Sequence, residues 1–174
     1  MLALFRHRAA TRRVRPMPVL TFPLATLEII ERGLKHCTIR LDARLKNLET
    51  GDRLTLAFGA RNAPVIRQAV LTRLERFNLE PLMTALLEAA EEQPDELEAD
   101  DAPLTPKEIE EVVQEIALEV MPDNKVQMLL EALSASGSTL FDLIVDANTR
   151  DRFEVFAVWF EFEDEHNKVK KVVR

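Results

Sequence analysis

Residues 33–40, Gly33-Leu34-Lys35-His36-Cys37-Thr38-Ile39-Arg40, lie where a short apolar helix is expected to end and a β-strand to begin. Before them, the spacing of apolar residues predicts a helix over Pro23 to Arg32. Its buried face would hold Leu24, Leu27, Ile30 and Leu34. Gly33 follows this helix at the position where a helix end favours a residue that tolerates positive φ. The stretch therefore predicts a helix end, a turn and a strand in close succession.

The predicted strand alternates between two kinds of side chain, so that it has one apolar and one polar face. The apolar face would hold Cys37, Ile39 and Leu41, and the polar face Thr38, Arg40 and Asp42. Lys35 lies at the entrance of the polar face. Because a hydroxyl group between two cations suits an anionic or carbonyl-bearing ligand, we expect a ligand such as a nucleotide on this face.

This stretch resembles the ASCH family, a β-barrel related to the PUA domain of RNA-modifying proteins. The family pattern is a strand, a helix, the string Gly-x-Lys-x-x-Thr-x-Arg and later a Gly-Asp turn into the next strand. The matching residues here are the strand 19–22, then Gly33, Lys35, Thr38 and Arg40, and the turn Gly51-Asp52. The resemblance covers residues 18–77 and resumes at the aromatic stretch 153–163.

The resemblance and the order of elements predict an α+β fold. We expect a small PUA-like β-barrel of five or six strands, with a helix after the first strand and an inserted helical hairpin before the last. Strands are expected at 18–22, 36–41, 53–58, 65–77 and 153–163, the last buried on both faces. Helices are expected at 79–92, from Thr105 to Val120 and from Asp123 to about Ala135. These elements predict a single domain over 18–174, with an acidic linker and helical insert at about 93–138.

Charge is unevenly distributed along the chain. Residues 1–77 hold 15 Lys or Arg and 6 Asp or Glu, whereas residues 78–174 hold 8 and 24. The net charge of −7 argues against a nonspecific nucleic-acid binder, but the first half permits a local basic face. Residues 1–17 are rich in arginine and are expected to be a flexible arm or an over-long start. A transit peptide and an RNA-contacting arm are the alternatives.

The composition also limits the class of protein. No apolar run approaches the roughly 20 residues that span a bilayer, so no membrane partner is expected. The single cysteine, Cys37, fits a reducing cytosol, and its apolar strand face predicts a buried structural thiol rather than a nucleophile. The three histidines are scattered, and neither a metal nor another cofactor is expected. We therefore expect a cytoplasmic protein.

The first functional hypothesis is binding of RNA or a nucleotide or nucleoside in the cleft that the resemblance implies. The residues expected to contact the ligand are Gly33, Lys35, Thr38 and Arg40, with Arg67 and Arg73 at the rim. Arg40 carries most of this hypothesis, because an arginine on the inner side of such a strand is expensive to bury without an anionic partner. That partner is either a ligand phosphate or an internal carboxylate such as Asp52.

The second hypothesis is an enzyme. Lys35 and Thr38 resemble the catalytic residues of an ASCH branch that removes the acetyl group from acetylcytidine, with threonine as nucleophile and lysine as base. Such a lysine needs a lowered pKa, which burial and Arg40 would both supply. Glu88 is the first choice for the required glutamate and Glu91 the second. The alternative is an ordinary strand threonine, with Lys35 capping the C-terminus of a helix.

The third hypothesis is a protein-interaction module that uses the helical insert. The helices after Thr105 each have an apolar face, which shows only that one side is buried. Residues 88–119 are strongly acidic, with 13 Asp or Glu and one Lys. We hypothesise that this segment screens the cleft from long polyanions, the alternative being a solvated linker and helix face.

Overall fold

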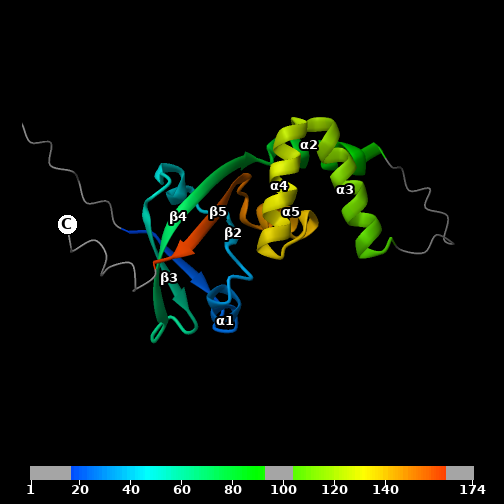
Figure 1. The fold of residues 1–174 in the computed structure, drawn as a ribbon. Coiled ribbons are helices and arrows are strands. Elements are labelled where there is room, and N and C mark those ends of the chain that lie inside the picture. Colours follow the sequence, from blue (N-terminus) through cyan, green and yellow to red (C-terminus); the bar gives the residue numbers. More distant parts are fainter. Residues whose placement is uncertain (1–16, 93–103, 164–174) are drawn as a thin grey trace, which may run out of the picture.

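The structure is a computed structural model that describes residues 17–92 and 104–163. Its α+β fold consists of a curled five-stranded half-barrel and a layer of helices beside it (Figure 1). The strands are β1 (Val19–Phe22), β2 (Cys37–Arg40), β3 (Arg53–Phe58), β4 (Val65–Asn78) and β5 (Glu154–Phe162). All five lie at the predicted places. Residues 1–16 of the predicted arm and the predicted linker 93–103 lie outside the described residues.

The strands are ordered β1-β3-β4-β5-β2. β1 pairs with β3 in parallel, and the other neighbours are antiparallel. β1 and β2 are therefore the two edges of the sheet, and no ladder joins them in the described residues. The predicted barrel is thus present as a half-barrel, with a seam between β1 and β2.

The inner face of the half-barrel is apolar. Its buried residues are Leu20, Phe22, Ile30, Leu45, Leu54, Leu56, Phe58, Ala69, Leu71, Phe156, Val158 and Phe160. Phe22 stacks on Phe58 with ring centroids 5.3 Å apart, and its ring meets Phe160 edge-on at 6.1 Å. These aromatic contacts hold β1, an edge strand, against the centre of the sheet.

The helix before β2 is shorter than predicted. α1 spans Thr26–Glu31, and a short 3-10 helix, η1, spans Ala43–Asn47. Ile30 is buried as expected, but Leu24 and Leu34 are 56% and 71% exposed, so the predicted burial of these two leucines was wrong. They lie outside the helical turns, and helical spacing therefore does not direct them to the core. Gly33 has a φ of +72°, which confirms the predicted left-handed helix end.

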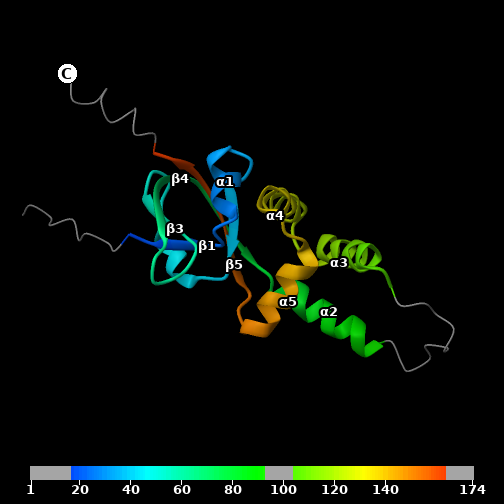
Figure 2. The ribbon, with the colours of Figure 1, turned by 90° about the horizontal axis from the view of Figure 1, so that it is seen from below.

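The helical layer holds α2 (Glu80–Glu92), α3 (Pro106–Val120), α4 (Asp123–Ser136) and α5 (Leu140–Arg150). The two predicted helices of the insert are present as α3 and α4, but the prediction missed α5, which follows them before the chain enters β5. Thr139 caps α5 by accepting a hydrogen bond from the backbone N–H of Asp142. Figure 2 shows α2 to α5 together on one side of the sheet.

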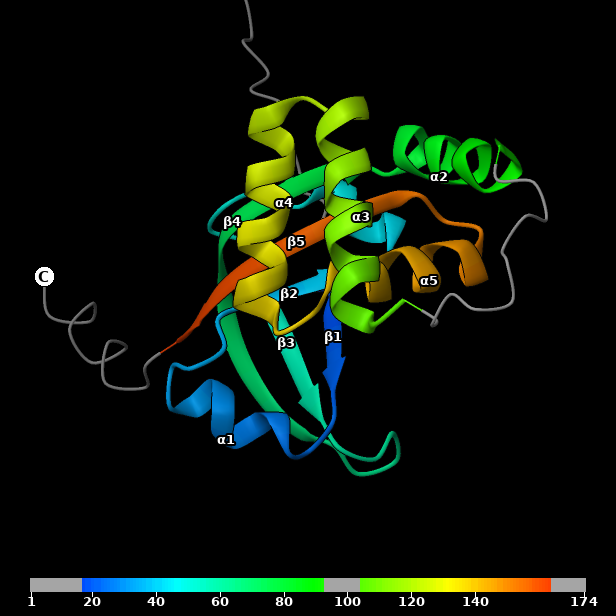
Figure 3. The same cartoon turned by 90° about the vertical axis from the view of Figure 1, so that its right-hand side faces the viewer.

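A second core lies between the helices and the outer face of the sheet. It contains Cys37, Phe77, Leu82, Val113, Val126, Leu129, Leu133, Leu143, Val155, Ala157 and Trp159, among others. α4 crosses the sheet over β5 and β2 (Figure 3). β5 supplies residues to both cores, which confirms the predicted strand buried on both faces. In the described residues, only α4 and α5 taken together meet the length and apolarity of a membrane span, and that pair is bent by 95°.

Candidate functional site

The residues of the Gly-x-Lys-x-x-Thr-x-Arg string separate onto the two faces of the sheet. Lys35 and Cys37 both contact α4. Lys35 Nζ donates to the carbonyl oxygen of Ser136 at 2.5 Å, and Cys37 Sγ lies 3.8 Å from the carbonyl oxygen of Ala132. Thr38 and Arg40 belong to the opposite face, because successive side chains of a strand alternate. The string thus holds α4 on one side and lines the half-barrel on the other.

Lys35 caps the C-terminus of α4. Its ammonium group meets a carbonyl oxygen of the last helical residue, where the helix dipole favours a positive charge. The sequence offered Lys35 as a cap for the helix that precedes it, whereas in the structure Lys35 caps α4. Burial of the side chain and then the charge of Arg40 lower the pKa of Lys35 below its ordinary value. Lys35 forms no ion pair with a carboxylate in the described part of the chain.

Cys37 is fully buried under α4. Burial, against the opposing charges of Lys35 and Arg73, raises the pKa of the Cys37 thiol to about 12. A thiol of this kind is not ionised near neutral pH and cannot act as a nucleophile there. The predicted buried structural thiol is therefore confirmed.

Thr38 and Arg40 lie beside the seam. Thr38 pairs with Val158 in the ladder and is 3% exposed, and its hydroxyl forms no hydrogen bond with a described residue. Arg40 Nη2 donates to the carbonyl oxygen of Thr21 on β1 at 2.7 Å. The Arg40 guanidinium carbon also lies 4.9 Å from the ring centroid of Phe22. Arg40 therefore connects the two edge strands.

Arg40 has no carboxylate partner among residues 17–92 and 104–163. Asp52, the internal partner considered from the sequence, instead accepts a hydrogen bond from the backbone N–H of Glu49. Burial and then the positive charge of Arg150 lower the pKa of Arg40, which nevertheless stays protonated. A half-buried cation whose main charged neighbour is another cation is a favourable place for an anion to bind.

Two further arginines reach this end of β2, one from the end of α5, the helix that the sequence did not predict, and one from the loop that follows it. Arg150 is at the end of α5 and pairs with Asp146 at 2.6 Å. Arg152 Nη1 donates to the carbonyl oxygen of Leu41 at 3.1 Å, and Leu41 directly follows Arg40 in the chain. The signals that would have revealed them are the Thr139 cap and the helical spacing of Leu140, Leu143, Ile144 and Ala147.

Arg67 and Arg73 do not gather around Arg40. Arg67 pairs with Glu31 of α1 at 2.9 Å. Arg73 belongs to the helical side, where its guanidinium lies 4.5 Å from the Trp159 ring centroid and pairs with Glu75 and Glu131. Arg73, Trp159 and Cys37 are register neighbours across β4, β5 and β2. Arg73 is therefore near Cys37, on the face opposite Arg40.

Glu88 is exposed on α2 and forms neither an ion pair nor a hydrogen bond with a described residue. α2 packs against α3, whereas α4 is the helix that contacts β2. The nearby carboxylate is Glu131 of α4, whose charge acts on Cys37. Lys35 therefore lies on the helical side of the sheet and Thr38 on the inner face, and neither Glu88 nor Glu91 contacts them in the described residues.

In comparisons with known proteins, no family model, no curated protein and no solved structure matches the chain.

Proposed function

We propose that the protein binds a nucleotide or a short RNA at the seam between β1 and β2, in the manner of an ASCH domain of the PUA-like superfamily. The observation that carries the proposal is Arg40, a half-buried guanidinium without a carboxylate partner in the described residues. A phosphate group would supply the missing negative charge. Arginine suits this role because its planar fork donates two parallel hydrogen bonds to phosphate oxygens.

The surroundings of Arg40 favour a ligand with both a phosphate and a polar body. The Thr38 hydroxyl shares the face of Arg40 and is free of described hydrogen-bond partners. Arg150 at the end of α5 and Arg152 in the loop after it bring further positive charge. Gly33 and Lys35 lie at the entrance to β2, where Lys35 adds positive charge from the helical side.

The charge of the whole protein favours small ligands over long ones. The net charge is −7, and residues 78–174 carry 16 more acidic than basic side chains. Long polyanions are repelled by such a field, whereas a compact ligand bound at Arg40 meets a local excess of cations. Of the acidic segment expected to screen the cleft, residues 93–103 lie outside the described residues.

The test is a binding titration of fluorescein-labelled short RNAs, with unlabelled nucleoside mono-, di- and triphosphates as competitors. Arg40→Gln should raise Kd by about tenfold or more, because a charge-assisted hydrogen bond contributes roughly 1.5–3 kcal/mol. Arg67→Gln is the matched control, since Arg67 is an arginine of the same sheet paired with Glu31. Affinity that is equal in wild type and Arg40→Gln, or lost equally in both variants, would reject the site.

A second candidate, an amidohydrolase acting on acetylcytidine, is favoured by one observation. Burial and Arg40 lower the pKa of Lys35. A lysine can act as a general base for a threonine nucleophile only if its pKa is lowered in this way. For this role the hydrogen bond from Lys35 to Ser136 must break and the lysine must move to the face of the sheet that holds Thr38, and another carboxylate must replace Glu88. Release of cytidine and acetate from acetylcytidine, abolished by Thr38→Ala, would support this activity. No release, or release that survives Thr38→Ala, would reject it.

A further inference from the structure

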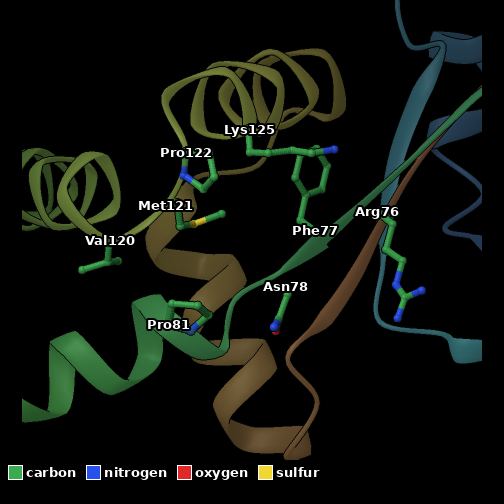
Figure 4. A pocket seen from close by; sticks show the side chains of 8 residues that line it. All are labelled: Arg76, Phe77, Asn78, Pro81, Val120, Met121, Pro122 and Lys125. Carbon is green, nitrogen blue, oxygen red and sulfur yellow. The ribbon is translucent and has the colours of Figure 1, made fainter.

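A pocket of about 390 Å³ lies at the junction of the sheet and the helical layer. It forms where β4 ends, α2 begins and the turn between α3 and α4 passes over both (Figure 4). Its lining residues are Arg76, Phe77, Asn78, Pro81, Val120, Met121, Pro122 and Lys125. The volume is within the range of about 300–1,000 Å³ that is typical of small-molecule sites.

The walls of the pocket are apolar. Phe77 and Met121 are 2% and 7% exposed, so both are held by the core behind them. Pro81 and Pro122 add rigid surfaces, and Val120, 36% exposed, lies at the rim. A ring or a short hydrocarbon chain placed here would be removed from water against side chains that are already ordered.

The polar groups of the pocket are the ammonium of Lys125, the guanidinium of Arg76 and the amide of Asn78. Lys125 extends over the ring of Phe77, with its ammonium 5.8 Å from the ring centroid (Figure 4). Lys125 Nζ forms a long ion pair with Glu75 Oε2 at 3.8 Å, beyond hydrogen-bonding distance, and the other oxygen of that carboxylate pairs with Arg73 at 3.2 Å. In the described residues the Lys125 ammonium donates no hydrogen bond, and its donors remain available.

Arg76 and Asn78 are partly occupied by contacts of their own. Arg76 pairs with Glu154 on β5. Asn78 Oδ1 accepts the backbone N–H of Glu80 at the start of α2, which leaves the Asn78 amide nitrogen as a donor. Lys125 and the Asn78 amide nitrogen thus offer donors above an apolar floor.

From this combination we propose a second binding site, separate from the seam, for a small organic anion with an aromatic or short aliphatic body. The apolar body would lie against Phe77 and Met121, and its carboxylate or sulfonate would accept hydrogen bonds from Lys125 and Asn78. The proposal does not depend on nucleotide binding, because the pocket shares no residue with the seam.

The probe is anilinonaphthalenesulfonate, an aromatic anion whose fluorescence rises in an apolar environment. It is titrated into the folded full-length protein, with the near-ultraviolet circular dichroism of Trp159 as the check that the native state persists, since the dye also binds partly folded states. We expect saturable binding. Phenylnaphthylamine, which has the rings without the sulfonate, should bind more weakly.

Two pairs of variants identify the site. Lys125→Gln should raise Kd for the sulfonate roughly fivefold, as expected for a partly exposed ion pair, whereas Lys107→Gln, an exposed lysine on α3, should leave it unchanged. Val120→Asp should weaken binding at least as much by repulsion, whereas Val112→Asp, at a similarly exposed position of the same helix outside the pocket, should not. Absence of binding to the native protein, equal binding of the neutral dye, or equal effects within either pair would overturn the proposal.

Discussion

Arg40 of β2 donates a 2.7 Å hydrogen bond to the carbonyl oxygen of Thr21 on β1, the opposite edge of the sheet. The contact crosses the seam that no backbone ladder closes in the described residues, and the guanidinium lies against Phe22 beside it. The residue proposed to bind an anion therefore also helps to close the half-barrel.

Arg40→Ala is expected to lower the free energy of unfolding by about 1–3 kcal/mol, because it removes a charge-assisted hydrogen bond and a cation–π contact. Urea denaturation measures the change. Arg67→Ala, which removes an exposed ion pair with Glu31, should lower it by less than about 1 kcal/mol. Equal losses in the two variants would show that the contact across the seam adds no stability.

Glu110 of α3 stabilises the start of α5. Its carboxylate accepts the backbone N–H groups of Leu140 at 3.0 Å and Phe141 at 2.9 Å. Burial by itself would raise the pKa of Glu110, but these hydrogen bonds and one from Gln114 outweigh it and hold the pKa below the ordinary 4.5. Glu110→Ala should therefore lower the free energy of unfolding at neutral pH by about 1 kcal/mol, like the loss of a helix N-cap.

The effect of Glu110 should depend on pH with a defined sign. Because its pKa is lower in the folded state, its stabilisation is fully present above the unfolded pKa and is lost as the pH falls through the folded pKa. The stability difference between wild type and Glu110→Ala should therefore shrink on acidification below pH 4.5. Glu111→Ala, which removes an exposed pair with Lys107, should have a much smaller effect at neutral pH. A difference that grows in acid would contradict this account.

Cys37 should resist alkylation in the native protein. With its thiol fully buried and its pKa raised to about 12, iodoacetamide at pH 8 should modify it only when the chain unfolds. Mass spectrometry after incubation in increasing urea should show modification that follows the unfolding transition. Since Cys37 is the single cysteine of the chain, the added mass has only one possible site. Rapid modification without urea would show that the contact between α4 and β2 opens in the native state.

Gly33→Ala should lower the free energy of unfolding by about 1–2 kcal/mol, because a φ of +72° is unfavourable for a residue with a β-carbon. Nothing lies within 4 Å of the added atom, so the loss would come from the backbone alone. Gly137→Ala, at a φ of +73° and equally open, is the matched comparison at the end of α4 and should lose a similar amount. Thermal denaturation of both variants checks this, and an unchanged Tm for Gly33→Ala would refute it.

The strands were predictable because their signals are local. Alternation placed β2 and the double burial of β5 correctly, and β3 has the predicted bounds. α5 was missed although its own residues carry local signals, the Thr139 cap and the helical spacing of Leu140, Leu143, Ile144 and Ala147. The contact of Glu110 with its start, in contrast, comes from another helix, and no pattern within residues 139–150 contains it.

The same distinction explains the candidate site. That Thr38 and Arg40 share a face follows from the period of a strand, and the structure agrees. That Lys35 meets Ser136 does not follow from the sequence, because the acceptor is a backbone carbonyl whose position depends on how α4 docks. The roles expected for Arg67 and Arg73 likewise depended on the curvature of β4, which has an irregular register between Leu71 and Arg73.

The sheet order also determines when the strand that holds Thr38 and Arg40 can form. β2 pairs only with β5 in the described ladders, and β5 is the last of the described strands to be synthesised. On the ribosome, β1, β3 and β4 can associate first, while β2 waits for a partner that follows four helices later. Contacts so distant in sequence form slowly. A nascent chain that stops before β5 would therefore carry an incomplete seam, and the binding site proposed there could form only after β5 has been synthesised.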